Sequence, residues 1–129
     1  MNPGCVPATN RTMDTIYYLS SCDTCRRILK ELRPPSGIRL QDIKVEPVSE
    51  SQLGEMWELS GSYEALVNKR ARLFAARDLK NRQLGESDYR ALLLEHYTFL
   101  KRPVIVTGGA IFMGNAAKTV AAAAEALHP

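Results

Sequence analysis

Apolar and polar residues change their spacing several times along the chain, and each change predicts a different element. Residues 15–19, Thr-Ile-Tyr-Tyr-Leu, are rich in β-forming side chains and predict a strand. Residues 20–23, Ser-Ser-Cys-Asp, follow at once and are typical of a helix start. Apolar residues then recur at helical spacing over residues 23–32. The first patterned part of the chain is therefore a strand that leads directly into a helix.

A second strand is predicted beyond this helix. Pro34, Pro35 and Gly37 end the helix, and residues 38–43 then alternate between apolar and polar side chains. Two strands joined by a helix usually pair in parallel through a right-handed crossover. We therefore expect a β-α-β unit at the start of the domain.

The middle of the chain, residues 49–99, carries helical patterns. Residues 49–52, Ser-Glu-Ser-Gln, resemble a capping segment, and Glu86 opens a later helix that continues through Leu94. Residues 62–81 predict short helices joined by a loop. This part is expected to form a helical insertion.

The last part of the chain predicts a hairpin and a helix. Residues 104–107 form an apolar strand pattern, Gly108 and Gly109 predict a tight turn, and residues 110–113 predict the antiparallel partner. A final helix is expected over about residues 116–127. The order β-α-β, helices, β-β-α predicts an α/β, thioredoxin-like fold with a mixed sheet and a helical insertion.

Length and composition predict one domain. The chain has 129 residues, of which 45% are hydrophobic and 24% charged, enough to bury a core without a disulfide or a metal. Residues 1–14 show no periodicity and predict a flexible tail before a domain over residues 15–129. The net charge of +3 weakly favours an anionic ligand, and the absence of a basic block argues against direct nucleic-acid binding.

Three cysteines, an odd number, are not the framework of a disulfide-stapled secreted domain. The sequence also has no apolar stretch of about twenty residues, and its start lacks the pattern of a secretory signal. We therefore expect a cytoplasmic protein that does not associate with membranes.

Two of the cysteines, Cys22 and Cys25, stand three residues apart at the predicted start of the first helix. Unpaired backbone amides there stabilise a thiolate, so a lowered pKa and high nucleophilicity are expected for Cys22. Cys25 would be the resolving thiol or a modulator. The alternatives are two packed cysteines or half of a zinc site.

A zinc site would need two further ligands, and the remaining candidates, Cys5, His96 and His128, have no paired spacing. No metal or bound cofactor is therefore predicted.

Three separated motifs, IYYLSSCDTCRRILKEL, NKRARLF and LKRPVIVTGGAIFMG, resemble in order and spacing the arsenate reductase family of the thioredoxin superfamily. This family includes glutaredoxin-coupled arsenate reductases and the Spx-type redox regulators of transcription. The resemblance covers the chain from about Thr15 to the last helix. It implies that Cys22 is the nucleophilic cysteine.

The resemblance also implies an oxyanion cradle made of Arg26, Arg70 and Arg102, with Pro103 as the family's cis proline. Planar guanidinium groups suit this role because they bind tetrahedral oxyanions through paired hydrogen bonds. The sequence departs from the family at two positions. Asn115 stands where reductases usually carry a third arginine, and Cys25 stands where classical members have serine.

Several functions are open at this point. The first is a thiol-dependent oxidoreductase that acts on a small oxyanion or thiol substrate, with glutathione and glutaredoxin, or thioredoxin, as electron donor and redox partner. The alternative is a Spx-type regulator, in which a Cys22–Cys25 disulfide changes the binding of a partner such as RNA polymerase. A third is a fold relative that binds thiols or anions without turnover.

Overall fold

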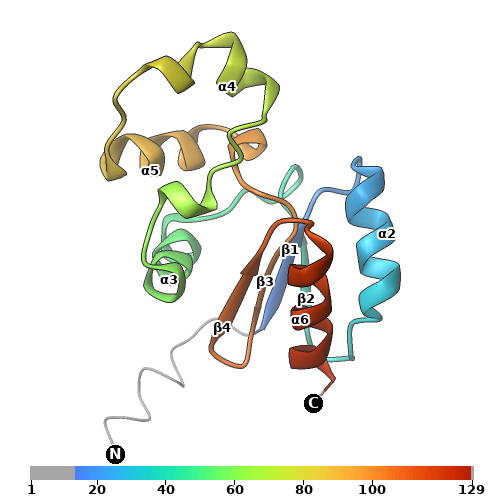
Figure 1. The fold of residues 1–129 in the computed structure, drawn as a ribbon. Coiled ribbons are helices and arrows are strands. Elements are labelled where there is room, and N and C mark those ends of the chain that lie inside the picture. Colours follow the sequence, from blue (N-terminus) through green and yellow to red (C-terminus); the bar gives the residue numbers. More distant parts are fainter. Residues whose placement is uncertain (1–13, 129) are drawn as a thin grey trace, which may run out of the picture.

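The computed structural model describes residues 14–128, which form one mixed four-stranded sheet with helices on both faces. The strands are β1 (Thr15–Tyr18), β2 (Arg39–Asp42), β3 (Val104–Thr107) and β4 (Ala110–Met113), and their order is β2-β1-β3-β4 (Figure 1). β1 is parallel to β2 and antiparallel to β3, and β3 is antiparallel to β4. The predicted β-α-β unit, late hairpin and mixed sheet are confirmed.

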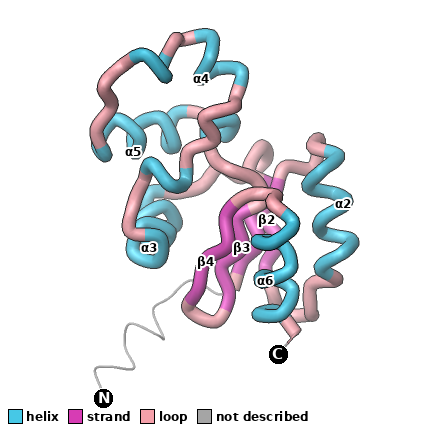
Figure 2. The backbone as a smooth tube through the Cα atoms, in the orientation of Figure 1, coloured by secondary structure: helices cyan, strands magenta, loops and turns pink. Residues whose placement is uncertain are grey.

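The helices divide into two groups. α2 (Asp23–Leu32) and α6 (Ala117–Leu127) lie side by side on one face of the sheet (Figure 1). The helical insertion lies on the other side and contains α3 (Glu50–Ser60), α4 (Arg72–Ala76) and α5 (Glu86–Glu95) (Figure 2). Three short 3-10 helices complete it: η1 (Glu64–Leu66), η2 (Leu79–Asn81) and η3 (Tyr97–Phe99). None of the helices in residues 14–128 has the length and apolar character needed to span a membrane.

Two apolar cores follow from the alternation of side chains along the central strands. Ile16 and Ile105 point to the face of α2 and α6, and pack with buried residues of those helices. Tyr17, Val104 and Val106 point to the opposite face and pack against the helical insertion. Each central strand is thus buried on both faces, which fixes the register of the sheet.

Most helix and strand boundaries in the structure lie close to those that local signals in the sequence predict. α2 has the predicted bounds, and β3 and β4 are joined by Gly108 and Gly109, whose φ angles of 58° and 78° suit a tight hairpin turn. α6 begins one residue later than predicted, at Ala117. Thus the hairpin and the two helices beside it are correctly predicted.

The predicted tail over residues 1–14 lies outside the described residues except for its last member, Asp14. The Asp14 carbonyl accepts a hydrogen bond from the Arg39 amide at 2.9 Å. Its carboxylate accepts one from the Thr107 hydroxyl at 2.7 Å. Asp14 therefore joins β2 and β3 at one end of the sheet.

The start of α3 is fixed by a capping box, as the sequence predicts. The Ser49 hydroxyl accepts from the Gln52 amide, and the Gln52 side chain accepts from the Ser49 amide, both at 3.0 Å. The same Gln52 side chain exchanges two hydrogen bonds with Gln41 of β2, at 3.1 and 2.7 Å. One side chain thus caps α3 and attaches this helix to the sheet.

We expect Ser49→Ala to lower the free energy of unfolding by about 1 kcal/mol, because the helix loses its N-cap acceptor. Ser51→Ala is the matched control, because Ser51 is exposed inside the same helix and alanine favours helix there. Urea unfolding monitored by circular dichroism measures both. Equal effects of the two substitutions would contradict the assignment of Ser49 as the cap.

Candidate functional site

Two thiols stand at the start of α2, in different surroundings. Cys22 is the N-cap residue of this helix, in an extended backbone conformation, and its side chain is half-buried. Cys25 lies one turn further on and is 0% exposed, packed in the core between the sheet and the helical insertion. Both cysteines are free thiols. The strand-to-helix junction therefore presents one sulfur to solvent and buries the other.

These surroundings shift the two pKa values in opposite directions. Partial burial opposes ionisation of Cys22, but hydrogen bonds from the Cys25 amide, the Cys25 thiol and the Thr24 amide, with the charge of Arg102, lower its pKa overall. Burial raises the pKa of Cys25 to about 11. Cys22 is thus the more acidic thiol of the pair, and the Cys25 thiol is a hydrogen-bond donor beside it.

A pocket of about 680 Å³ opens at Cys22. Four separate segments of the chain line it: Cys22 and Thr24; Glu64 and residues 67–70; Lys101 and Arg102; and residues 113–116. Its four basic side chains, Lys69, Arg70, Lys101 and Arg102, outnumber one acidic residue, Glu64, which forms an ion pair with Lys69. The pocket therefore carries a net positive charge and favours an anionic group.

Backbone pairing brings the helical insertion to this pocket. Val67 and Leu100 form an isolated antiparallel bridge. The Asn68 amide donates to the Phe99 carbonyl at 2.7 Å, and the Lys101 amide donates to the Leu66 carbonyl at 2.9 Å. These bonds place the loop that carries Arg70 beside the loop that carries Arg102.

Side-chain hydrogen bonds fix the Arg70 loop and the segment that precedes it. The Asn68 side chain accepts from the Arg70 amide at 3.0 Å and shapes the turn. Before the loop, Glu86 of α5 accepts from the Tyr63 amide at 2.8 Å and the Glu64 amide at 3.1 Å. These amides hold the pKa of Glu86 below its usual range. The carboxylate therefore stays ionised and connects α5 to η1.

Arg102 has an unused donor. Its peptide bond to Pro103 is cis, and its side chain lines the Cys22 pocket. The Nη1 atom is buried and has no hydrogen-bond partner among residues 14–128. A buried donor without a partner costs free energy, so an anion bound beside it would be stabilised.

Arg26, the remaining arginine assigned to the cradle, does not line this pocket. Its guanidinium forms an ion pair with Asp23 and donates to the Ser20 carbonyl at 3.2 Å. The spacing explains this, since residues three apart on a helix are neighbours on its surface. The structure thus brings together Cys22, Arg70, Arg102 and also Asn115, and leaves Arg26 on the solvent side of α2.

Sequence reasoning missed two basic residues of the pocket, Lys69 and Lys101. Each directly precedes an arginine that the motifs singled out, so the dipeptides Lys-Arg were a signal that could have found them. The structure places both lysines on the pocket wall.

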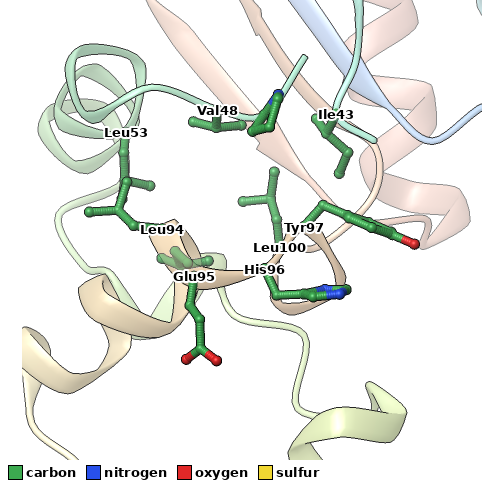
Figure 3. Close-up of a pocket in the computed structure, with 10 residues that line it drawn as sticks. Ile43, Val48, Leu53, Leu94, Glu95, His96, Tyr97 and Leu100 are labelled. Atoms are coloured by element: carbon green, nitrogen blue, oxygen red, sulfur yellow. The ribbon is translucent and has the colours of Figure 1, made fainter. Parts of the chain in front are cut away.

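A second cavity, of about 330 Å³, lies between the β2–α3 connection and α5 (Figure 3). Its lining is mainly apolar and includes Ile43, Leu53 and Leu100. Its one carboxylate, Glu95, forms an ion pair with Arg77. The cavity contains no thiol, so it is separate from the reactive centre.

The zinc alternative finds no support in the part of the chain that the structure describes. No group of three or more potential ligands is close enough there to hold a metal ion. His96 accepts a hydrogen bond from the Thr98 amide at 3.1 Å, and His128 contacts the Leu32 carbonyl at 2.8 Å. Cys5 lies outside the described residues.

Comparisons with known proteins fit this geometry. A model of the ArsC family matches residues 17–123, which include Cys22, Arg70 and Arg102. An uncharacterised protein of Haemophilus influenzae is 31% identical over 105 residues, which cover 79% of this chain and 90% of that protein.

Two solved structures share the fold. The YffB protein has a TM-score of 0.70 at 24% identity, covering 89% of this chain and 99% of that one. The arsenate reductase from Vibrio cholerae has a TM-score of 0.65 at 22% identity, covering 90% of this chain and 100% of that one. The predicted thioredoxin-like fold with a helical insertion is confirmed.

We expect Arg102→Gln to raise the pKa of Cys22, because the substitution removes a positive charge that favours the thiolate. The rate of alkylation by iodoacetamide rises with pH as the thiolate forms and then levels off. Its midpoint should move to higher pH in Arg102→Gln. Arg26→Gln is the control and should leave the midpoint in place, and a similar shift in both variants would contradict the assignment.

Proposed function

The chain belongs to the ArsC family, and from this premise we propose that it is a thiol-dependent oxidoreductase of the arsenate-reductase type. The observation that carries the proposal is the Cys22 thiolate in one positively charged pocket with Arg70 and Arg102. A lowered pKa increases the fraction of nucleophilic thiolate at a given pH, and the guanidinium groups bind the oxygens of its target.

The chemistry follows from this arrangement. The Cys22 sulfur attacks the central atom of an oxyanion, or one sulfur of a disulfide, while Arg70 and Arg102 hold the anionic oxygens. With arsenate, the arsenic gains two electrons, two thiols become one disulfide, and one water is released. Cys22 supplies the first of these thiols, and a second thiol completes the reaction.

We propose that the second thiol comes from outside the chain, from glutathione with glutaredoxin. Cys25 is 0% exposed, and burial raises its pKa to about 11, so it is a poor attacking thiolate. Its thiol hydrogen bond lowers the pKa of Cys22 instead. In this role Cys25 positions and activates the nucleophile, and thioredoxin is the less favoured donor because it would need the Cys22–Cys25 disulfide.

Asn115 bears on the choice of substrate. It lines the pocket at the position where the family resemblance implies a third arginine, and its amide carries no charge. The pocket therefore holds an inorganic oxyanion less strongly than it would with an arginine at position 115. This favours a substrate of smaller negative charge, such as a disulfide that carries one anionic group.

A Spx-type redox regulator is the second proposal, because Cys22 and Cys25 are both free and stand one helical turn apart. In that function their disulfide would change the binding of RNA polymerase. The cytoplasmic location expected from the sequence stays a prediction under either proposal.

The proposed function is tested by NADPH-coupled arsenate reduction, once with glutathione and glutaredoxin and once with thioredoxin. Cys22→Ser should abolish turnover, because the nucleophile is lost. Cys25→Ser should retain turnover with glutaredoxin, because the serine hydroxyl can donate the same hydrogen bond to the Cys22 sulfur. Unchanged activity in Cys22→Ser would refute the proposal.

If the wild-type protein shows no turnover with either donor, disulfide reduction by Cys22 is measured next. Two results together would favour the regulator. The protein would be inactive toward both substrate classes, and its binding to RNA polymerase would differ between reducing and oxidising conditions.

We also expect Asn115→Arg to lower the KM for arsenate, because it adds a third guanidinium to the pocket. Ala122→Arg is the matched control: Ala122 is exposed on α6 and lines none of the pockets described here. Steady-state kinetics at fixed glutathione measure both variants. An equal fall of KM in the two would mean that net charge, rather than position 115, governs arsenate binding.

A further inference from the structure

An apolar groove runs along the two helices that begin at the reactive pocket. It has a volume of about 410 Å³ and lies between α2 and α6. Buried residues of the core form its floor, namely Ile28, Leu32 and Val120, and small residues of α6 form one wall, namely Ala117, Ala121 and Ala124. Arg27 and Glu31 of α2 lie on the other wall and form an ion pair at 3.8 Å.

The groove continues from the Cys22 pocket. Asn115 lines both hollows, and the N-cap residues of the two helices, Cys22 and Ala116, line the pocket. α2 and α6 run side by side in the same direction (Figure 1), so the pocket lies at their shared N-terminal end and the groove lies along their length. A molecule held at Cys22 thus has a path between the helices.

The middle of α6 presents only apolar side chains, whereas the charged residues Lys118 and Glu125 are exposed nearer its ends. Ala121 and Ala122 are exposed, and from Val120 to Ala124 the helix carries no polar side chain. Surface helices normally present charged or polar residues to solvent. Among the described residues that line the groove, the charged ones are Arg27 and Glu31, which form an ion pair.

We propose that the substrate is a peptide disulfide, with its reactive sulfur at Cys22, an acidic group against Arg70 and Arg102, and apolar side chains in the α2–α6 groove. This inference rests on the proposed function and names its substrate class. An inorganic oxyanion would use only the positively charged end, whereas the groove is continuous with it and its lining carries no net charge.

The dimensions fit a short peptide. From Ala117 to Ala124 the groove follows α6 for about 10 Å at the rise of an α-helix. This length accommodates about three residues of extended chain. The unpaired Nη1 atom of Arg102 gives a carboxylate beside the cysteine a hydrogen-bond donor at the other end.

The reaction is a thiol–disulfide exchange. The Cys22 thiolate attacks the peptide sulfur, a new bond forms between these two sulfurs, the peptide disulfide breaks, and the other sulfur leaves as a thiolate. No further oxidant or reductant enters this step. A second thiol, such as glutathione, then releases the peptide by the same exchange.

The test uses a synthetic peptide with one cysteine, an aspartate on one side of it and three leucines on the other. Two versions are made, one with the aspartate before the cysteine and one with the aspartate after it. The cysteine is joined to thionitrobenzoate, whose release is followed by its colour. Matched peptides carry three serines in place of the leucines. In single-turnover experiments, the preferred leucine peptide should react about tenfold faster than its serine counterpart, since apolar side chains are buried.

Two neighbouring alanines provide the matched variants. Ala121→Gln fills the groove with a longer neutral side chain and should remove most of the leucine preference, whereas Ala122→Gln should retain it. The mixed disulfide of thionitrobenzoate with 2-mercaptoethanol is too small to reach the groove and should react equally with all three proteins.

Equal rates for leucine and serine peptides in the wild-type protein, or the same loss in both alanine variants, would overturn the peptide-groove proposal while leaving Cys22 chemistry intact. Failure of the small disulfide to react, or its reaction in Cys22→Ser, would instead overturn the proposed function, and the groove inference with it. The two failures are therefore distinguishable.

Discussion

The functional site depends on a short stretch of backbone pairing between two loops that are far apart in the sequence. The bridge between Val67 and Leu100, with the hydrogen bonds on either side of it, holds the end of the helical insertion against the segment that leads into β3. Because these bonds are made by the backbone, they place Arg70 beside Arg102 whatever the neighbouring side chains are. The apolar core and the Gln41–Gln52 hydrogen bonds hold the insertion against the sheet, and this pairing sets where its Arg70 loop lies.

The second determinant is the different burial of two identical side chains. Cys22 precedes the first turn of α2 and receives hydrogen bonds from its amides, whereas Cys25 lies inside the core and receives little solvation. Ionisation is therefore easier at Cys22 than at Cys25. This difference follows from position along the helix, since Cys22 is the N-cap residue at the open end of α2 and Cys25 lies one turn further on, inside the core.

Local patterns predicted the fold well because each main element carries its own signals. α2 follows helix-starting residues, and the β3–β4 hairpin has two glycines between apolar strands. The site was less predictable. Motif position indicated Arg70 and Arg102, but Arg26 pairs with Asp23 on the outside of the helix, and the contributions of Lys69 and Lys101 depend on loop pairing that no local pattern encodes. The catalytic roles of the two cysteines remain predictions.

Assembly of the Cys22 surroundings from four distant segments also governs when this thiol becomes reactive. In the unfolded chain Cys22 lacks the helix amides, the neighbouring thiol and the guanidinium that together favour its ionised form. Its acidity there is that of an ordinary cysteine, and most of it is protonated at neutral pH. Completion of the fold is thus what lowers the pKa of this thiol, so its acidity reports whether the four segments have come together.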